Sequence, residues 1–225
     1  MPSYVIVWEN NTFGHQKVSG HTWPGHSAIN IGNIFDDEDM ARAFNSYVSW
    51  WPGEGADFGV KGVIKAMFKK AQKGDRNLTL GQDVDSEGYL PDHFIKLDTT
   101  DEQEKKMKAE WLTVLMKKGG ATYKNLRKNC STICSRVLHA GGFYSKKWAV
   151  NNNFAWSPGD VRALACSSGG TLMKWTDVLE LLKKSGITGD SLSAKEARSG
   201  VFCSTGAPCN YQKTETFKGD GTKKN

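Results

Sequence analysis

The sequence has no long apolar run. No segment approaches the roughly 18 consecutive apolar residues that a bilayer-spanning helix needs, so we expect no membrane span. The N-terminal segment MPSYVIVWEN lacks a basic region, a long apolar stretch and a cleavage site, and it therefore predicts no signal peptide. If the protein acts outside the cytoplasm in which it is made, it needs an export route that does not use such a signal.

Metal-binding patterns are also missing. None of the 5 cysteines forms a CxxC pair and the 5 histidines are dispersed, which argues against a zinc site. Asp83, Asp85 and Glu87 resemble the first half of a calcium loop, but Phe94 stands where the bidentate glutamate is required. We therefore expect neither a metal nor a cofactor.

Cys203 and Cys209 bracket a Gly-Ala-Pro turn near the C-terminus. Two interpretations stay open for this pair. The cysteines could close a small disulfide loop in an oxidising compartment, or they could be two ordinary thiols in a flexible tail.

The charge is basic but not concentrated. The net charge is +6, and much of the excess lies in lysine pairs spread along the chain, a pattern typical of solvated faces. No nucleic-acid-binding signature accompanies it, so we expect no nucleic-acid partner. A basic protein would still concentrate near anionic polymers such as an acidic cell wall.

The length of 225 residues fits one domain, which we place at residues 1–185. Residues 186–225 are rich in Gly, Ser, Thr and Lys and predict a loosely ordered extension. Strands come first and helices later, which indicates an α+β fold. We expect strands at 3–9, 26–35, 46–51 and 93–97, and helices at 99–118, 130–140, 157–165 and 174–184. Residues 59–76 read as a short helix or a surface insertion, and residues 80–92 as a polar loop.

The segment around Cys130 is the first that points to chemistry. Asn129 is a good N-cap residue, which places Cys130 in the first turn of the predicted helix. There the helix dipole and unpaired backbone amides favour a thiolate, and Arg127 and Lys128 add positive charge nearby. Cys130 is thus either a nucleophile or a buried structural thiol. Cys134 lies one turn on and is expected in the core.

A nucleophilic thiol needs a base. His26 opens a predicted strand, where its side chain can project from a sheet toward a facing helix. His93 opens another strand and ranks second. His139 lies on the same helix as Cys130, more than two turns on, and cannot reach back to it. His15 and His21 fall in loops.

These residues occur in segments that resemble a known family. GHSAINIG, SYVSWWPG, PDHFIKLD and YKNLRKNCSTICSRVLHAGG, in that order, resemble circularly permuted NlpC-type papain-like cysteine hydrolases. The resemblance covers roughly residues 3–165 and is strongest to bacterial effector hydrolases delivered by type VI secretion. Lecithin retinol acyltransferase-like enzymes share the arrangement, but the chain lacks their acidic and aromatic residues directly after the cysteine.

The resemblance implies a permuted papain-like fold, in which a small antiparallel sheet packs on the cysteine-bearing helix. It implies Cys130 as nucleophile and His26 as general base and acid. The group that orients the imidazole should come from the next strand, where Ser49 and Tyr47 share one face. His93, Asp92 or a backbone carbonyl are alternatives.

The resemblance also implies a substrate, an amide bond in bacterial peptidoglycan, cut in the periplasm of a target cell. An immunity protein and a component of the secretion apparatus would then be partners. Two alternatives stay open: a hydrolase or acyltransferase directed at a protein or lipid, and a non-enzymatic basic binding module. Trp50, Trp51 and Pro52 would wall the substrate groove or lie in the core.

Overall fold

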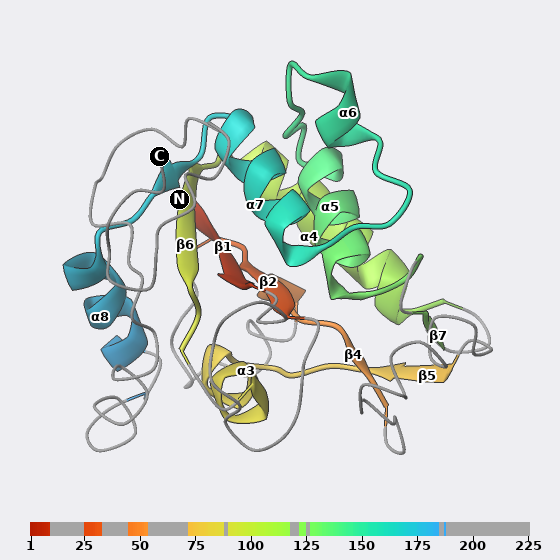
Figure 1. The fold of residues 1–225 in the computed structure, drawn as a ribbon, viewed down its shortest axis with the longest axis horizontal. Helices are drawn as coiled ribbons and strands as arrows, with labels where there is room; N and C mark the ends of the chain where they lie inside the picture. Colours follow the sequence, from red (N-terminus) through yellow and green to blue (C-terminus); the bar gives the residue numbers. More distant parts are fainter. Residues whose placement is uncertain are drawn as a thin grey trace, which may run out of the picture.

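A computed structural model of the chain describes residues 1–9, 25–32, 45–53, 72–87, 90–117, 122–124, 127–184 and 187. Within these residues the fold combines helices with two antiparallel sheets (Figure 1), which confirms the α+β class. The predicted loops around His15 and His21, most of segment 59–76 and all of the C-terminal extension except Ile187 lie outside the described residues. No helix in the described parts of the chain is long and apolar enough to cross a bilayer.

The main sheet has five strands in the order β3-β2-β1-β6-β8, and all its pairs are antiparallel. Its strands are β1 (Pro2–Trp8), β2 (His26–Asn30), β3 (Tyr47–Val48), β6 (His93–Asp98) and β8 (Thr171–Leu172). In the β1–β2 register His26 pairs with Trp8, at the end where β2 begins. Strands β2 and β3 pair antiparallel, with Ile29 opposite Val48.

Helices cover both faces of this sheet. On one face lie α4 (Asp101–Leu115), α5 (Cys130–Ala140) and α7 (Pro158–Ser167), and on the other lie α3 (Leu80–Glu87) and α8 (Trp175–Lys184) (Figure 1). Alternate residues of β1 enter two separate cores: Val5 and Val7 face the first group of helices, whereas Ile6 faces the second. Strand β2 is consequently buried along its whole length, not half-buried as its alternating pattern predicts.

Local signals set the helix boundaries as expected. Thr100 and Ser157 cap α4 and α7 through capping boxes, with Pro158 in the first turn of α7. The short α6 (Trp148–Asn151) joins α5 to α7. The predicted helices near the C-terminus are therefore confirmed within a few residues.

The structure departs from the sequence interpretation at two places. Residues 80–87 form α3 and not a polar loop, because Leu80 and Val84 recur at helical spacing and pack in the core. The end of segment 59–76 is also not helical: it forms strand β5 (Gln72–Asp75). That strand joins β4 (Trp51–Pro52) and β7 (Thr122–Tyr123) in a small sheet of order β4-β5-β7.

Candidate active site

Cys130 is the first residue of α5. The side chain of Asn129 accepts a hydrogen bond from the Thr132 backbone N–H at 2.7 Å and so caps the helix. Its amide nitrogen donates to the Trp156 carbonyl at 2.8 Å, which fixes the cap against the segment before α7. The predicted N-cap is confirmed, and it presents the Cys130 thiol at the positive end of the helix dipole.

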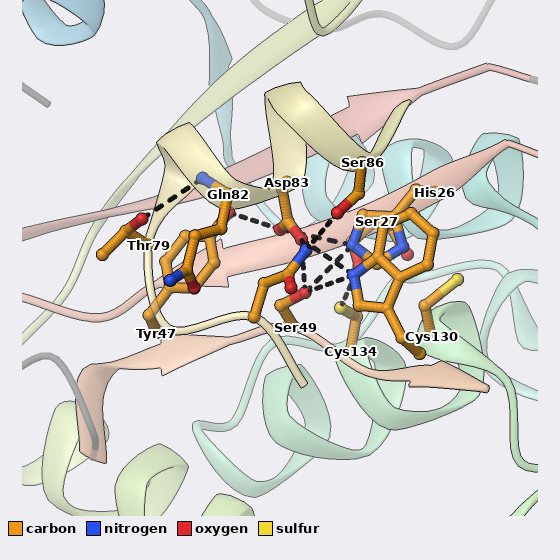
Figure 2. A network of polar contacts seen from close by, with 12 residues as sticks. His26, Ser27, Tyr47, Ser49, Thr79, Gln82, Asp83, Ser86, Cys130 and Cys134 are labelled. Atoms are coloured by element: carbon orange, nitrogen blue, oxygen red, sulfur yellow. Dashed lines mark hydrogen bonds and ion pairs between the residues drawn. The ribbon is translucent and has the colours of Figure 1, made fainter. Parts of the chain in front are cut away.

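His26, the first residue of β2, lies beside that thiol. The Cys130 thiol lies close enough to the His26 imidazole for each group to shift the pKa of the other, and both residues are buried. The other side of the ring faces α3, where the Asp83 carboxylate Oδ2 lies 3.3 Å from His26 Nε2. Figure 2 shows His26 between Asp83 and Cys130. Since Nε2 faces Asp83, Nδ1 is the ring nitrogen left for the thiol.

Asp83 is fully buried and is surrounded by donors. Its oxygens accept hydrogen bonds from the Tyr47 hydroxyl at 2.6 Å, the Ser49 hydroxyl at 2.7 Å, Trp51 Nε1 at 2.8 Å and Asn77 Nδ2 at 2.8 Å. So many donors hold the carboxylate in its ionised form and fix its position. It can therefore orient the imidazole.

Of the residues proposed from sequence as the orienting group, Ser49 and Tyr47 lie in this cluster, whereas Asp92 and His93 contact Glu9. Ser49 lies 3.2 Å from His26 Nε2 and shares this contact with Asp83, and Tyr47 reaches the same carboxylate, as their common face predicts. Asp92 accepts the Glu9 backbone N–H, and His93 pairs with the Glu9 carboxylate. Sequence reasoning missed Asp83 because it assigned residues 80–92 to a loop. The apolar spacing of Leu80 and Val84 was the signal that could have revealed the helix.

Opposing effects shift the pKa values of the cluster. Burial would raise the Cys130 pKa, but the charge and hydrogen bond of His26, the Ser27 backbone N–H and the Ser131 hydroxyl lower it below its ordinary value. Burial would lower the His26 pKa, but the charges of Asp83 and Cys130 raise it well above its ordinary value. Both shifts favour a thiolate–imidazolium pair.

The two cations that precede the helix do not act on this thiol as predicted. The guanidinium of Arg127 stacks 4.6 Å from the Phe154 ring centroid, and Lys128 Nζ donates to Thr122 Oγ1. The lowered Cys130 pKa comes from His26, Ser27 and Ser131 instead.

Ser27 connects β2 to α5 through contacts with several residues of the helix. Besides its backbone contact with Cys130, its hydroxyl lies 3.1 Å from the Ser131 hydroxyl and its carbonyl accepts the Cys134 thiol at 3.3 Å. Burial raises the Cys134 pKa well above its ordinary value, and the Cys130 charge raises it further. Cys134 is thus a buried core thiol, as expected, and it stays protonated.

The neighbouring tryptophans differ in role. Trp51 stacks on His26 with ring centroids 4.3 Å apart, so one face of the imidazole is covered. Trp50 is 3% exposed and meets Trp111 edge to face in the core. Trp50 therefore lies in the core, which is one of the two roles that the sequence left open for these tryptophans.

Among the described residues, no cluster of His, Cys, Asp and Glu side chains is arranged to hold a metal ion. Asp83 and Glu87, which suggested half a calcium loop, lie buried on α3. Cys166 is disulfide-bonded, whereas Cys203 and Cys209 lie outside the described residues.

The chain was compared with known proteins. It matches no protein-family model, and neither a curated protein nor a solved structure matches it significantly.

Proposed function

We propose that the protein is a cysteine hydrolase with a permuted papain-like arrangement, in which Cys130 is the nucleophile and His26 the general base and acid. The observation that carries the proposal is the buried cluster in which the His26 imidazole lies between the Cys130 thiol and the Asp83 carboxylate. A nucleophile in contact with a base, which a third group orients, is the arrangement that thiol catalysis requires. Asp83 takes the orienting role, with Ser49 sharing the contact to His26.

The reaction is acyl transfer to water. The Cys130 thiolate attacks the carbonyl carbon, and the backbone N–H groups at the start of α5, which have no partner within the helix, stabilise the oxyanion. The imidazolium of His26 gives its proton to the leaving amine as the C–N bond breaks. His26 then takes a proton from water, which attacks the thioester and releases the acid and the thiolate. The charges balance without a cofactor.

For the substrate we propose an amide bond of bacterial peptidoglycan, with the protein acting as an antibacterial effector delivered by type VI secretion. The sequence resemblance supports this choice, and the net charge of +6 would favour binding to an acidic wall. An immunity protein would then protect the producing cell.

The first experiment measures the rate of Cys130 alkylation by iodoacetamide against pH, in the parent protein and in His26→Ala. A reactive thiolate that persists well below pH 8.5, the approximate pKa of a free thiol, and that is lost in His26→Ala, supports the catalytic pair. A sluggish thiol that is indifferent to His26 contradicts it. Ser168→Ala, at the C-cap of α7 and outside the catalytic cluster, is the control.

The second experiment identifies the substrate. Purified sacculi are digested with the parent protein and with Cys130→Ala, and the muropeptides are separated by chromatography. Cleaved stem peptides in the parent digest alone support the peptidoglycan proposal. Intact sacculi combined with thiol-dependent hydrolysis of an acyl ester or isopeptide probe would instead indicate a lipid or protein substrate.

A further inference from the structure

A second candidate site lies between α4 and α5. A cavity of about 680 Å³ opens there, away from the catalytic cluster. Its lining consists of Ala109, Leu112, Thr113, Val114, Met116, Lys117, Thr122, Lys128, Ile133 and Arg136. Cys130, His26 and Asp83 do not line it, so the proposed hydrolase activity gives this cavity no role.

The floor of the cavity is apolar. Ile133 and Val114 are buried and belong to the main core, and Leu112 is half-buried beside them. Met116, at the end of α4, is 80% exposed and forms an apolar wall. Ala109, Leu112 and Met116 share one face of the helix by their spacing, so the wall is continuous.

The rim is cationic. Lys117, Lys128 and Arg136 line the same cavity, and Lys128 Nζ donates to Thr122 Oγ1 at 3.3 Å. Lys117 lies close enough to Lys128 for its side chain to lower the Lys128 pKa, and burial and the charges of Lys117, Lys124 and Arg136 lower that pKa further. Two ammonium groups that face each other repel, and an anion placed between them would remove that repulsion.

Among the residues that the structure describes, little of this positive charge is compensated. Arg136 forms an ion pair with Glu110, which lies on α4. The charged groups that shift the Lys128 pKa are all cations. The rim therefore carries a surplus of positive charge, while the floor offers apolar surface.

We propose that this cavity binds a small amphipathic anion, with its carboxylate or phosphate head between Lys117 and Lys128 and its apolar body against Leu112 and Ile133. The volume lies within the range of about 300–1,000 Å³ that is usual for small-molecule sites. Such sites combine a mostly apolar lining with a few placed polar groups, as this cavity does. Charge complementarity selects an anion over a neutral amphiphile.

The test uses dodecanoate as the probe, titrated below its critical micelle concentration into the full-length protein and followed by calorimetry. We expect saturable binding that weakens as salt rises, because the rim charges are screened. Dodecanol should bind at least about tenfold more weakly, because it lacks the charge that the lysines recognise. Cys130→Ala should bind dodecanoate like the parent, which separates this cavity from the proposed active site.

Variants locate the site. The double variant Lys117→Gln/Lys128→Gln should lose about tenfold or more in affinity. Lys105→Gln/Lys106→Gln, which removes two exposed lysines of α4 that do not line the cavity, should not change it. The exposed position allows Met116→Gln without loss of the fold, and this change should weaken binding a few-fold.

The proposal is overturned if no saturable binding occurs, if dodecanol binds as well as dodecanoate, or if the two double variants bind alike. Binding that is lost in Cys130→Ala would place the ligand in the active site instead. An acidic peptide that binds where dodecanoate does not would assign the cavity to a protein partner and equally reject the proposal.

Discussion

The Asp83 carboxylate Oδ2 lies 3.3 Å from His26 Nε2, although 57 positions separate these residues in the chain. Asp83 comes from α3 and His26 from β2, so the contact exists only because the helix packs against the sheet. Both side chains are buried. A charged carboxylate at such a position needs compensation, which the surrounding donors and the imidazolium supply.

Asp83→Asn should weaken the thiolate at Cys130. Without the carboxylate the raised pKa of His26 falls, so less imidazolium is present to stabilise the thiolate. Because one pKa unit is a tenfold change in ionisation, alkylation by iodoacetamide at pH 6.5 should slow about tenfold or more.

The control for this change is Asp85→Asn, which removes a carboxylate from an exposed position of the same helix. Its alkylation profile should match that of the parent protein. Thermal unfolding, followed by circular dichroism, establishes that Asp83→Asn is folded. An unchanged pH profile in a folded Asp83→Asn protein would show that Asp83 does not act on His26.

Tyr47→Phe should lower the free energy of unfolding more than it changes the reactivity of the Cys130 thiol. The hydroxyl donates to a buried carboxylate, and a hydrogen bond to a charged group contributes about 1.5–3 kcal/mol. The lowered pKa of Asp83 means that its stabilising effect is present above its unfolded pKa and is lost as pH falls through its folded pKa. The deficit in urea unfolding should thus be present at pH 7 and shrink below about pH 4. A deficit that stays constant with pH would contradict this assignment.

Glu87→Gln should stabilise the protein at alkaline pH. Burial raises the pKa of Glu87 to about 7, and its Oε2 has no hydrogen-bond partner. Since the folded pKa exceeds the unfolded value of about 4.3, parental stability falls as pH rises between these values and then levels off. Glutamine avoids this loss, so the variant should gain up to about 3 kcal/mol at pH 8 and little at pH 4.5.

Urea unfolding of both proteins across this pH range measures the Glu87 effect. Glu180→Gln replaces an exposed glutamate on α8 and should leave the curve unchanged. A Glu87→Gln difference that is the same at pH 4.5 and pH 8 would mean that Glu87 does not titrate in this range.

Cys130 and Cys134 should react very differently. The Cys130 pKa is lowered, whereas burial and the Cys130 charge raise the Cys134 pKa well above its ordinary value. Brief treatment with iodoacetamide at pH 7 should therefore label Cys130 and leave Cys134 free, as peptide mass spectrometry can determine. Cys134→Ser keeps a donor for the Ser27 carbonyl and should leave Cys130 labelling intact. Equal labelling of both thiols would contradict the pKa difference.

Gly74→Ala should destabilise the small sheet. A Cβ at this position would lie 1.9 Å from Cζ2 of the buried Trp50 ring, so the indole or the strand must move. Overpacking of this kind costs about 1–3 kcal/mol. Gly159→Ala is the matched control, because its nearest heavy atom is 3.8 Å away. Thermal unfolding of the two variants should differ clearly, and equal midpoints would show that the Trp50 region yields without cost.

Much of the local structure could be predicted from the sequence. Asn129, Thr100 and Ser157 act on backbone groups within one helical turn of themselves, so their capping roles could be recognised without tertiary contacts. Because Asn129 is such a cap, the sequence also predicted that Cys130 begins α5.

What only the tertiary structure decided is which distant groups meet. Asp83 reaches His26 because α3 packs on the sheet, and this packing also turned a segment that reads as a polar loop into a helix with a buried acid. Likewise, Lys117 and Lys128 meet at the rim of one cavity because α4 lies against α5. Helix caps and period-two alternation depend on neighbours in sequence, whereas such contacts depend on the packing of whole elements. The sequence by itself therefore determined the helix that begins at Cys130 and the candidate base, and the packing of α3 and α4 determined what surrounds them.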